Sequence, residues 1–392
     1  MSKKQLALLV ALGNRNMKYL SSIVVILFLF GFTTSTVNPE ERSIEDITAD
    51  LVKEVAKDNI GSLSISILKH DSITYFRSYG KINKFNKFIP DTSTLFRIAS
   101  VSKSFAAVLM LKLMEEGYFK LDDPIENYLP EVKLLIGYSD STKITFRQLA
   151  SHTAGIQRNS NPNGGQSGAT SDWEKKTVSS ISHTKFIFRP NTKMVYSNVG
   201  YAILGLAMSR AANTSYIKLM SDKIFVPLKM DNTFFDVPEN KLNKLADGTC
   251  DCGLLNGKNR RVPREGQKGL GYDVPGGGIF TTSSDLSKLL AVLMGTSKQR
   301  IITEQSLLDM QTGVMKYPDA IRRTFKNVKY GLGTVVYHLD NDMTVFAHSG
   351  STPGYWTTYA YDPAKKVAVI IMLNYDKHLD NEGTVVKILN QL

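Results

Sequence analysis

The sequence is poor in cysteine and tryptophan and contains no repeated unit. With two Cys in 392 residues, it cannot be built on a disulfide framework. Its 28 Gly show no period of three, which excludes a collagen-like chain. The 42% share of hydrophobic residues is too high for a disordered protein. The length therefore suits a globular protein of two domains, or one large domain with an inserted lobe.

The two cysteines, Cys250 and Cys252, are separated by a single residue. A bridge between positions so close would strain disulfide geometry. Zinc needs four ligands, and no further Cys or His stands nearby. We predict free or weakly paired thiols in a loop, and the sequence indicates neither a metal site nor a cofactor.

The net charge of +12 is spread along the chain, with mild clusters at residues 258–264 and 322–329. A nucleic-acid-binding protein concentrates its positive charge on one element. We therefore expect a basic, solvated surface and no nucleic-acid partner. Attraction to an anionic cell envelope is the alternative interpretation.

The N-terminal segment has the layout of an export signal. Lys3, Lys4, Arg15 and Lys18 precede the apolar residues 23–32. Even counted from residue 20, this core is shorter than the roughly 20 residues of a membrane-spanning helix. It suits a signal-peptide core better than a buried helix. We predict that residues 1–37 form a signal peptide or signal anchor, and that residues 38–392 function in the periplasm or outside the cell.

The rest of the chain has strands at both ends and helices between them. Alternating residues predict a hairpin at 61–69 and 73–79, with four more strands at 330–337, 343–348, 355–361 and 367–374, and a helix at 382–389. Helical stretches are predicted at 104–116, 145–151, 199–212, 215–225 and 285–294, the last capped by Ser283 or Ser284. This order predicts an α+β fold, with an antiparallel sheet from about 61–80 and 330–392 beside a helical lobe at about 100–300. A cleft is expected where lobe and sheet meet.

The pattern Ser-x-x-Lys occurs five times and is uninformative alone, at Ser66/Lys69, Ser78/Lys81, Ser100/Lys103, Ser182/Lys185 and Ser215/Lys218. The first two pairs fall in predicted strands, where residues three apart face opposite sides. The fourth precedes a strand-like stretch, and the fifth starts an amphipathic surface helix. Only Ser100 stands before a long apolar helix, on which Lys103 shares its face.

Such a position suits nucleophilic catalysis. Burial lowers the pKa of a lysine and leaves an amine that can take the proton of Ser100. The N-terminus of the helix adds N–H groups for a developing oxyanion. The alternative is that Ser100 only caps the helix and that Lys103 is a surface residue.

Two further motifs each occur once: Tyr196-Ser197-Asn198, before a predicted helix, and His348-Ser349-Gly350, at the end of a predicted strand. With the segment around Ser100, they resemble the serine β-lactamase and penicillin-binding-protein superfamily. The class C β-lactamase branch, with its D-Ala-D-Ala carboxypeptidases and esterases, is the most similar. Matching segments at 144–156, 196–205 and 348–355 follow the family order. The resemblance implies a β-lactamase/transpeptidase-like fold over about residues 61–374.

The resemblance implies a catalytic role for three residues. Ser100 would be the acyl-accepting nucleophile and Lys103 its base. Tyr196 would be the second proton-transfer group, relaying a proton to the leaving group. Asn198 would bind the substrate by a hydrogen bond to its amide side chain.

The same resemblance makes residues 348–351 a substrate-binding strand, formed by His348, Ser349, Gly350 and Ser351. The oxyanion hole would consist of the backbone N–H groups of Ser100 and Ser351. Gly350 would let the strand approach the substrate closely.

The chain departs from the class C pattern at His348, where these β-lactamases typically carry Lys. Histidine is mostly neutral at pH 7 unless a carboxylate raises its pKa. The departure favours a peptidase, amidase or esterase, in which the imidazolium of His348 helps bind an anionic group or shuttles a proton. His152, in a family landmark segment, is interpreted as structural.

We therefore expect an exported serine hydrolase that forms an acyl-enzyme on Ser100. Its substrates would be D-Ala-D-Ala-type peptides, cell-wall peptides among them, β-lactams, or related amides and esters. Three alternatives stay open: a penicillin-binding sensor that acylates without turnover, a carboxylesterase of the same family, and a structural protein that has lost the chemistry.

Overall fold

The computed structural model describes residues 43–392 except 59–60, 83–87, 161–164, 251–259, 263–269, 318–326, 340–341 and 376–379. The predicted export signal and Cys252 lie outside the described residues, so both interpretations stay predictions. No helix among the described residues is long and apolar enough to cross a membrane.

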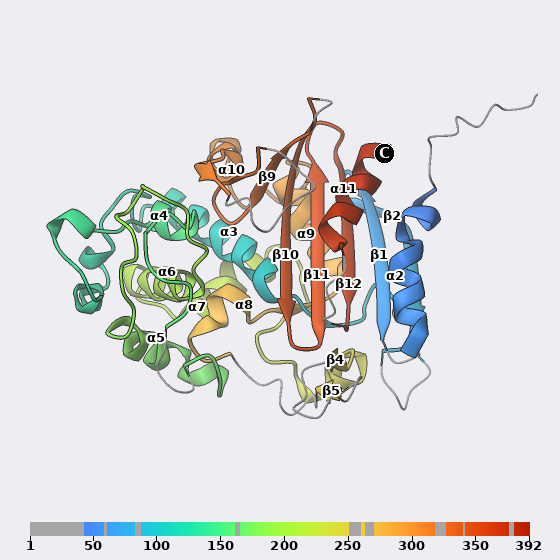
Figure 1. Ribbon diagram of the computed structural model, residues 1–392, viewed down its shortest axis with the longest axis horizontal. Coiled ribbons are helices and arrows are strands. Elements are labelled where there is room, and N and C mark those ends of the chain that lie inside the picture. The colour runs from blue at the N-terminus through green and yellow to red at the C-terminus, as the bar shows by residue number, and fades with distance from the viewer. Residues whose placement is uncertain are drawn as a thin grey trace, which may run out of the picture. The chain divides into compact units, whose positions relative to one another are not determined.

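The central feature is an eight-stranded antiparallel sheet in the order β2-β1-β12-β11-β10-β9-β8-β7 (Figure 1). The strands are β1 (Ser62–Lys69), β2 (Ser72–Gly80), β7 (Met315–Lys316), β8 (Lys329–Tyr330), β9 (Val335–His338), β10 (Thr344–Thr352), β11 (Tyr355–Asp362) and β12 (Val367–Leu373). Because β1 pairs with β12, the two chain ends build one sheet. This confirms the fold predicted from the strand pattern.

Both faces of the sheet centre are buried, as alternate residues of β12 show. Val369 and Ile371 belong to one hydrophobic core, whereas Ile370 and Met372 belong to the other. Helices α2 (Ile44–Asp58) and α11 (Asn381–Gln391) cover the first face (Figure 1). The opposite face carries α9 (Ser283–Leu293) and continues into the helical lobe. Such two-sided burial explains why β12 is apolar throughout rather than alternating with polar residues.

The lobe holds α3 (Ser102–Glu115), α4 (Phe146–Ala150), α5 (Trp173–Ile181), α6 (Asn198–Ala211), α7 (Tyr216–Met220) and α8 (Val274–Gly277), with α10 (Glu304–Gln311) nearer the sheet. Helices α3 and α6 are buried almost all round, as expected of helices without a polar face. The remaining strands are short: β3 (Phe96–Arg97) pairs with β6 (Phe280–Thr281), and β4 (Gly248–Cys250) pairs with β5 (Arg260–Val262). Cys250 therefore ends a short strand rather than lying in a loop.

Several sequence predictions need correction. The single strand predicted at 330–337 is two strands, β8 and β9, which are separated by residues 331–334. Strand β10 extends to Thr352 and does not end at His348, because residues 349–352 pair with β11 across a tight hairpin. The side chain that caps α9 belongs to Thr282, which accepts from the N–H of Asp285. Helices α2, α5 and α10 were not predicted, although Ile44, Ile47, Leu51 and Val55 give α2 a helical spacing.

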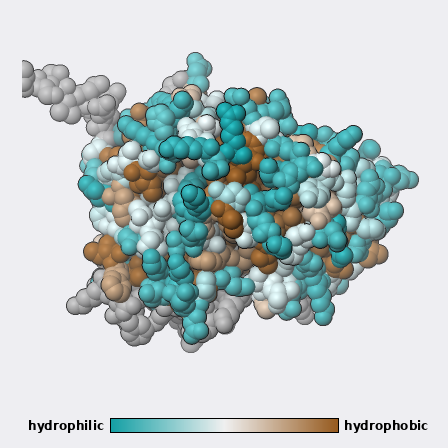
Figure 2. Space-filling model, turned by 180° about the vertical axis from the view of Figure 1, so that it is seen from behind, coloured by the Kyte–Doolittle hydropathy of each residue, from teal (hydrophilic) through white to brown (hydrophobic). Residues whose placement is uncertain are grey.

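The surface opposite to the view of Figure 1 is mainly hydrophilic. Figure 2 shows hydrophobic side chains there in small, separate groups among polar ones. Scattered apolar residues of this kind are ordinary on a globular protein, and none of these groups points to a particular partner.

Candidate active site

Ser100 lies in a 3₁₀ turn, Ala99–Val101, immediately before α3. The helix is capped at Val101 without a side-chain bond, so Ser100 is not the cap considered in the alternative interpretation. Ala99 has a φ of 45°, a left-handed conformation that residues other than Gly rarely adopt. Such strain persists where the surrounding structure enforces it, often at functional sites. Here it fixes the turn that presents Ser100.

The side chain of Lys103 is fully buried one helical turn further on. Its Nζ donates to Ser100 Oγ (3.1 Å), to Asn198 Oδ1 (3.0 Å) and to the Gly276 carbonyl oxygen (2.8 Å). Burial lowers the pKa of Lys103 to about 8, opposed by the negative charge of Asp273. Of the five Ser-x-x-Lys pairs, all within the described part of the chain, this one has its hydroxyl and amine in hydrogen-bond contact. Lys103 is therefore an amine suited to accept a proton near neutral pH.

Tyr196 and Asn198 flank the start of α6, which Ser197 caps by accepting from Gly200 N–H. The Lys103 ammonium lies 5.0 Å from the ring centroid of Tyr196. Asn198 receives the Lys103 bond on Oδ1 and donates from Nδ2 to Asn159 Oδ1 (2.9 Å). The structure thus brings Ser100, Lys103, Tyr196 and Asn198 together. The side-chain amide of Asn198, which the sequence analysis expected to bind the substrate, forms hydrogen bonds to Lys103 and Asn159.

His152 holds the segment that carries Tyr196. Its carbonyl oxygen accepts from Val195 N–H (2.9 Å), and its Nδ1 accepts from Ser197 N–H (3.1 Å). The ring lies against Tyr196, with centroids 4.2 Å apart. Burial lowers the pKa of His152 well below its usual value, and the nearby charge of Lys103 adds to this. His152 is therefore a neutral residue that accepts hydrogen bonds from both neighbours of Tyr196, Val195 and Ser197.

Strand β10 forms the opposite wall of the site. Its residues 344–347 pair with β9, whereas residues 348–352 pair with β11 alone among the described strands. Gly350 lies against the Ser100 turn, and a Cβ there would come within 2.6 Å of Ser100 N and 2.9 Å of Val101 N. Only glycine allows the strand this close to the nucleophile.

Two residues of this wall have their side chains engaged within the protein. His348 Nδ1 lies 2.9 Å from the Ser349 carbonyl oxygen, which can only accept, and Nε2 lies 2.9 Å from the Tyr330 hydroxyl. The Ser349 hydroxyl accepts from Trp356 Nε1 (2.8 Å) and contacts Thr358 Oγ1 (2.9 Å). His348 is buried, and a neutral ring that donates from Nδ1 and accepts at Nε2 satisfies both of its contacts.

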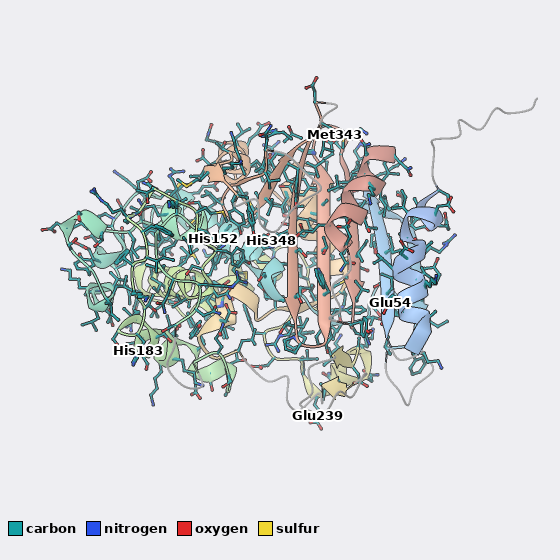
Figure 3. The ribbon with its side chains drawn as sticks, viewed as in Figure 1. Glu54, His152, His183, Glu239, Met343 and His348 are labelled. Carbon is teal, nitrogen blue, oxygen red and sulfur yellow. The ribbon has the colours of Figure 1, made fainter. Side chains whose placement is uncertain are left out.

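A cleft of about 440 Å³ separates the two walls. This volume suits a small molecule or a short peptide segment. Figure 3 shows His152 and His348 near each other where the lobe meets β10, with His183 far out on the lobe. The lining includes five predicted residues and eight others: Ser100, Tyr196, His348, Ser349 and Ser351, with Arg158, Tyr317, Tyr330, Val335, Trp356, Asp380, Asn381 and Glu382.

Sequence reasoning missed four residues of the site. Asn159 holds Asn198, and Tyr330 holds His348. Arg158 lies over the ring of Tyr196, 4.9 Å from its centroid. Asp273 is a buried carboxyl near Lys103, and burial raises its pKa. None belongs to a short motif that signals its role, because each acts on a partner distant in the sequence.

Comparison with known proteins identifies the family. Residues 47–388 match the family described as Beta-lactamase, and the chain belongs to this family, within the serine β-lactamase and penicillin-binding-protein superfamily. Beta-lactamase-like protein 4 of Dictyostelium discoideum is 28% identical over 334 residues, which are 82% of this chain and 58% of that protein. The chain thus spans less than two thirds of that relative.

Two solved structures show the same fold. The octameric penicillin-binding protein homologue from Pyrococcus abyssi has a TM-score of 0.74 at 23% identity, covering 89% of this chain and 77% of its own. A class C beta-lactamase has a TM-score of 0.73 at 23% identity, covering 91% and 98%. The fold of the chain is therefore that of these two proteins.

Proposed function

We propose that the protein is a serine hydrolase that forms an acyl-enzyme on Ser100 with a small amide or ester substrate. D-Ala-D-Ala-type peptides and β-lactams belong to this class of substrate. The observation that carries the proposal is the buried Lys103, whose amine is 3.1 Å from the hydroxyl of Ser100 and has a pKa of about 8. A base with a pKa near the working pH is best placed to activate a hydroxyl.

The proposed reaction uses both walls. Lys103 takes the Ser100 proton as Oγ bonds to the substrate carbonyl carbon, and the N–H groups of Ser100 and Ser351 stabilise the oxyanion. The bond to the leaving group then breaks, and Tyr196 relays the proton to that group. Water attacks the acyl-enzyme and releases the acid, returning the proton to Ser100.

Labelling with a fluorescent penicillin and with a short-chain aryl ester tests this proposal. Intact-mass analysis should show one adduct, on the peptide that contains Ser100, and Ser100→Ala should abolish it without unfolding the protein. An adduct on Ser66, Ser78, Ser182 or Ser215 would contradict the assignment. A stable adduct without released product would instead identify a penicillin-binding sensor.

A carboxylesterase is the second candidate, and one observation favours it. His348 replaces the lysine that class C enzymes typically place at this position, and its ring is bonded to Tyr330 and Ser349. Among the described residues that line the strand wall, none is therefore a permanent cation that could meet a substrate carboxylate. Turnover of a neutral aryl ester much faster than of a D-Ala-D-Ala peptide would support the esterase.

We also propose that the protein acts outside the cytoplasm. The support is the sequence of residues 1–37, with its basic start and short apolar core. N-terminal sequencing of material from the native host tests this, because export predicts either a chain that begins near residue 38 or an uncleaved chain in the membrane fraction. A full-length chain in the cytoplasm would refute it.

A further inference from the structure

Arg158 lies at the cleft, on the wall formed by the helical lobe. It lines the same cavity as Ser100 and Tyr196, and its guanidinium carbon is 4.9 Å from the ring centroid of Tyr196. The backbone around it is held firmly, since its carbonyl oxygen accepts from Asn198 N–H (2.8 Å) and Val199 N–H (3.3 Å). The start of α6 thus fixes the backbone position from which the Arg158 side chain extends.

Arg158 forms no ion pair within the described part of the chain. The residue is exposed, and its guanidinium lies over the face of the Tyr196 ring. Its charge also acts on the buried Asp273, where it opposes the rise of the carboxyl pKa. Its charge nevertheless reaches the reacting groups, because it lowers the pKa of Lys103 and of His152. An exposed guanidinium with free donors beside the nucleophile is suited to bind a carboxylate through two parallel hydrogen bonds.

The cleft is also lined by groups of the opposite charge. They are Asp380, the N-cap of α11, and Glu382, in the first turn of that helix. Glu382 accepts from the Tyr337 hydroxyl (2.9 Å), and Asp380 lies 3.8 Å from Lys387. Two carboxylates disfavour an anionic group near α11, and both ring nitrogens of His348 already have protein partners. The charge distribution therefore directs an anion toward Arg158.

We propose that Arg158 is the anion-binding residue of the cleft and selects substrates that carry a carboxylate, which it holds against the lobe wall. This inference rests on the proposed hydrolase function and adds the charge class of its substrate. In this proposal the anion of the substrate is bound by the lobe residue Arg158, whose backbone contacts the start of α6, and not by the β10 position at which class C enzymes carry a lysine.

Two matched substrate pairs test the proposal, since the carboxylate can stand on either half of the substrate. The first compares para-nitrophenyl hemiadipate with para-nitrophenyl hexanoate, which differ in the acyl group. The second compares para-acetoxybenzoate with para-acetoxybenzamide, which differ in the leaving group. In at least one pair the wild type should prefer the anion, and Arg158→Gln should lower kcat/KM about tenfold more for the anion than for its uncharged partner. The comparison within a pair is needed because the charge of Arg158 also acts on Lys103, which serves both substrates. Arg158→Lys should recover part of this loss.

Two controls distinguish a failure of the Arg158 proposal from a failure of the proposed hydrolase function. Arg210→Gln removes an equal charge about 18 Å along α6 from its first residue, Asn198. This variant should leave kcat/KM unchanged for both substrate pairs. Titrating the charged and uncharged ligands into Ser100→Ala by calorimetry measures anion binding without turnover, so it decides the role of Arg158 even if no ester is hydrolysed. Equal losses on charged and uncharged partners, or no loss on either, would overturn the proposal and leave Arg158 as packing for Tyr196.

Discussion

The two walls of the cleft differ in what they contribute to the site: buried side chains on one and a backbone edge on the other. The lobe wall gathers Ser100, Lys103 and Tyr196 at the N-terminal ends of two helices, α3 and α6, that are buried almost all round. Lys103 has no access to water there. The strand wall contributes a backbone edge at Gly350 and a side chain, His348, whose ring nitrogens already have protein partners. In the proposed reaction, proton transfer depends on the first wall, whereas the second contributes the N–H group of Ser351 to the oxyanion hole.

This division explains where the chain can vary. A buried amine between three acceptors tolerates almost no change, because any unpaired polar group there costs free energy. The strand wall acts mainly through backbone N–H groups, which any residue that keeps the strand geometry provides. We therefore expect the replacement of the family lysine by His348 to be compatible with the proposed reaction but to change which substrates bind.

The largest effect is expected at Lys103. Lys103→Met should lower the rate of acylation about a thousandfold, because the general base is lost. The measurement is the rate of labelling by a fluorescent penicillin or an aryl ester. Lys218→Met removes the lysine of another Ser-x-x-Lys pair, whose amine contacts Asp222 instead, and should keep wild-type rates. Comparable rates in Lys103→Met and the wild type would exclude Lys103 as the base.

The same variant should change how stability depends on pH. In the unfolded chain Lys103 has its ordinary pKa of 10.5, and in the fold burial lowers it to about 8. Between these values the unfolded state binds more protons, so wild-type stability should rise with pH by up to about 3 kcal/mol relative to Lys103→Met. Denaturant unfolding at pH 7 and pH 10 measures this. A constant difference between the two proteins would show that the pKa is not shifted.

On the strand wall, Gly350→Ala should cost about a hundredfold in kcat. The added Cβ would meet the backbone of Ser100 and displace an oxyanion donor, a loss of this size in other acyl-transfer sites. Ser351→Ala is the matched control, since its exposed side chain is removed while its N–H remains. If Ser351→Ala is as impaired as Gly350→Ala, the hydroxyl rather than the backbone is important.

The sequence was sufficient for the overall fold because the strands at both ends are strongly patterned. It was insufficient for β10 beyond His348, since the Ser-Gly-Ser-Thr-Pro text resembles a turn and only pairing with β11 makes it a strand. It also missed α5 and α10, short helices whose stability comes from packing rather than from local preference.

The site also has a part that the sequence predicts and a part that it does not. Ser100 and Lys103 are three residues apart, and Tyr196 and Asn198 two apart, so local geometry places each pair. Partners such as Arg158, Asp273 and Tyr330 have no fixed spacing to the motifs, because tertiary folding brings them together. The motif places His348 beside Gly350, but nothing in the sequence predicts its bond to Tyr330.

His152 offers a smaller test of the lobe wall. His152→Asn should retain activity within about threefold, because Asn tolerates the positive φ of 60° at this position and can place an acceptor near Nδ1. His152→Gly accepts the same φ without an acceptor, and should lose about thirtyfold in kcat through misplacement of Tyr196. Acylation kinetics together with thermal unfolding distinguish the two roles. Equal rates in Asn and Gly variants would reduce His152 to a space-filling residue.

The smallest effect is expected from Tyr330→Phe, which removes the hydroxyl bonded to His348. One hydrogen bond contributes about 0.5–1.5 kcal/mol, so kcat/KM should fall between about two- and tenfold. Because both ring nitrogens of His348 have protein partners, we expect the residue to position the strand, and the loss should be equal for a carboxylate-bearing ester and its uncharged partner. A loss confined to the anionic ester, and relieved by His348→Lys, would restore the charged role predicted from the sequence and place anion recognition back on β10.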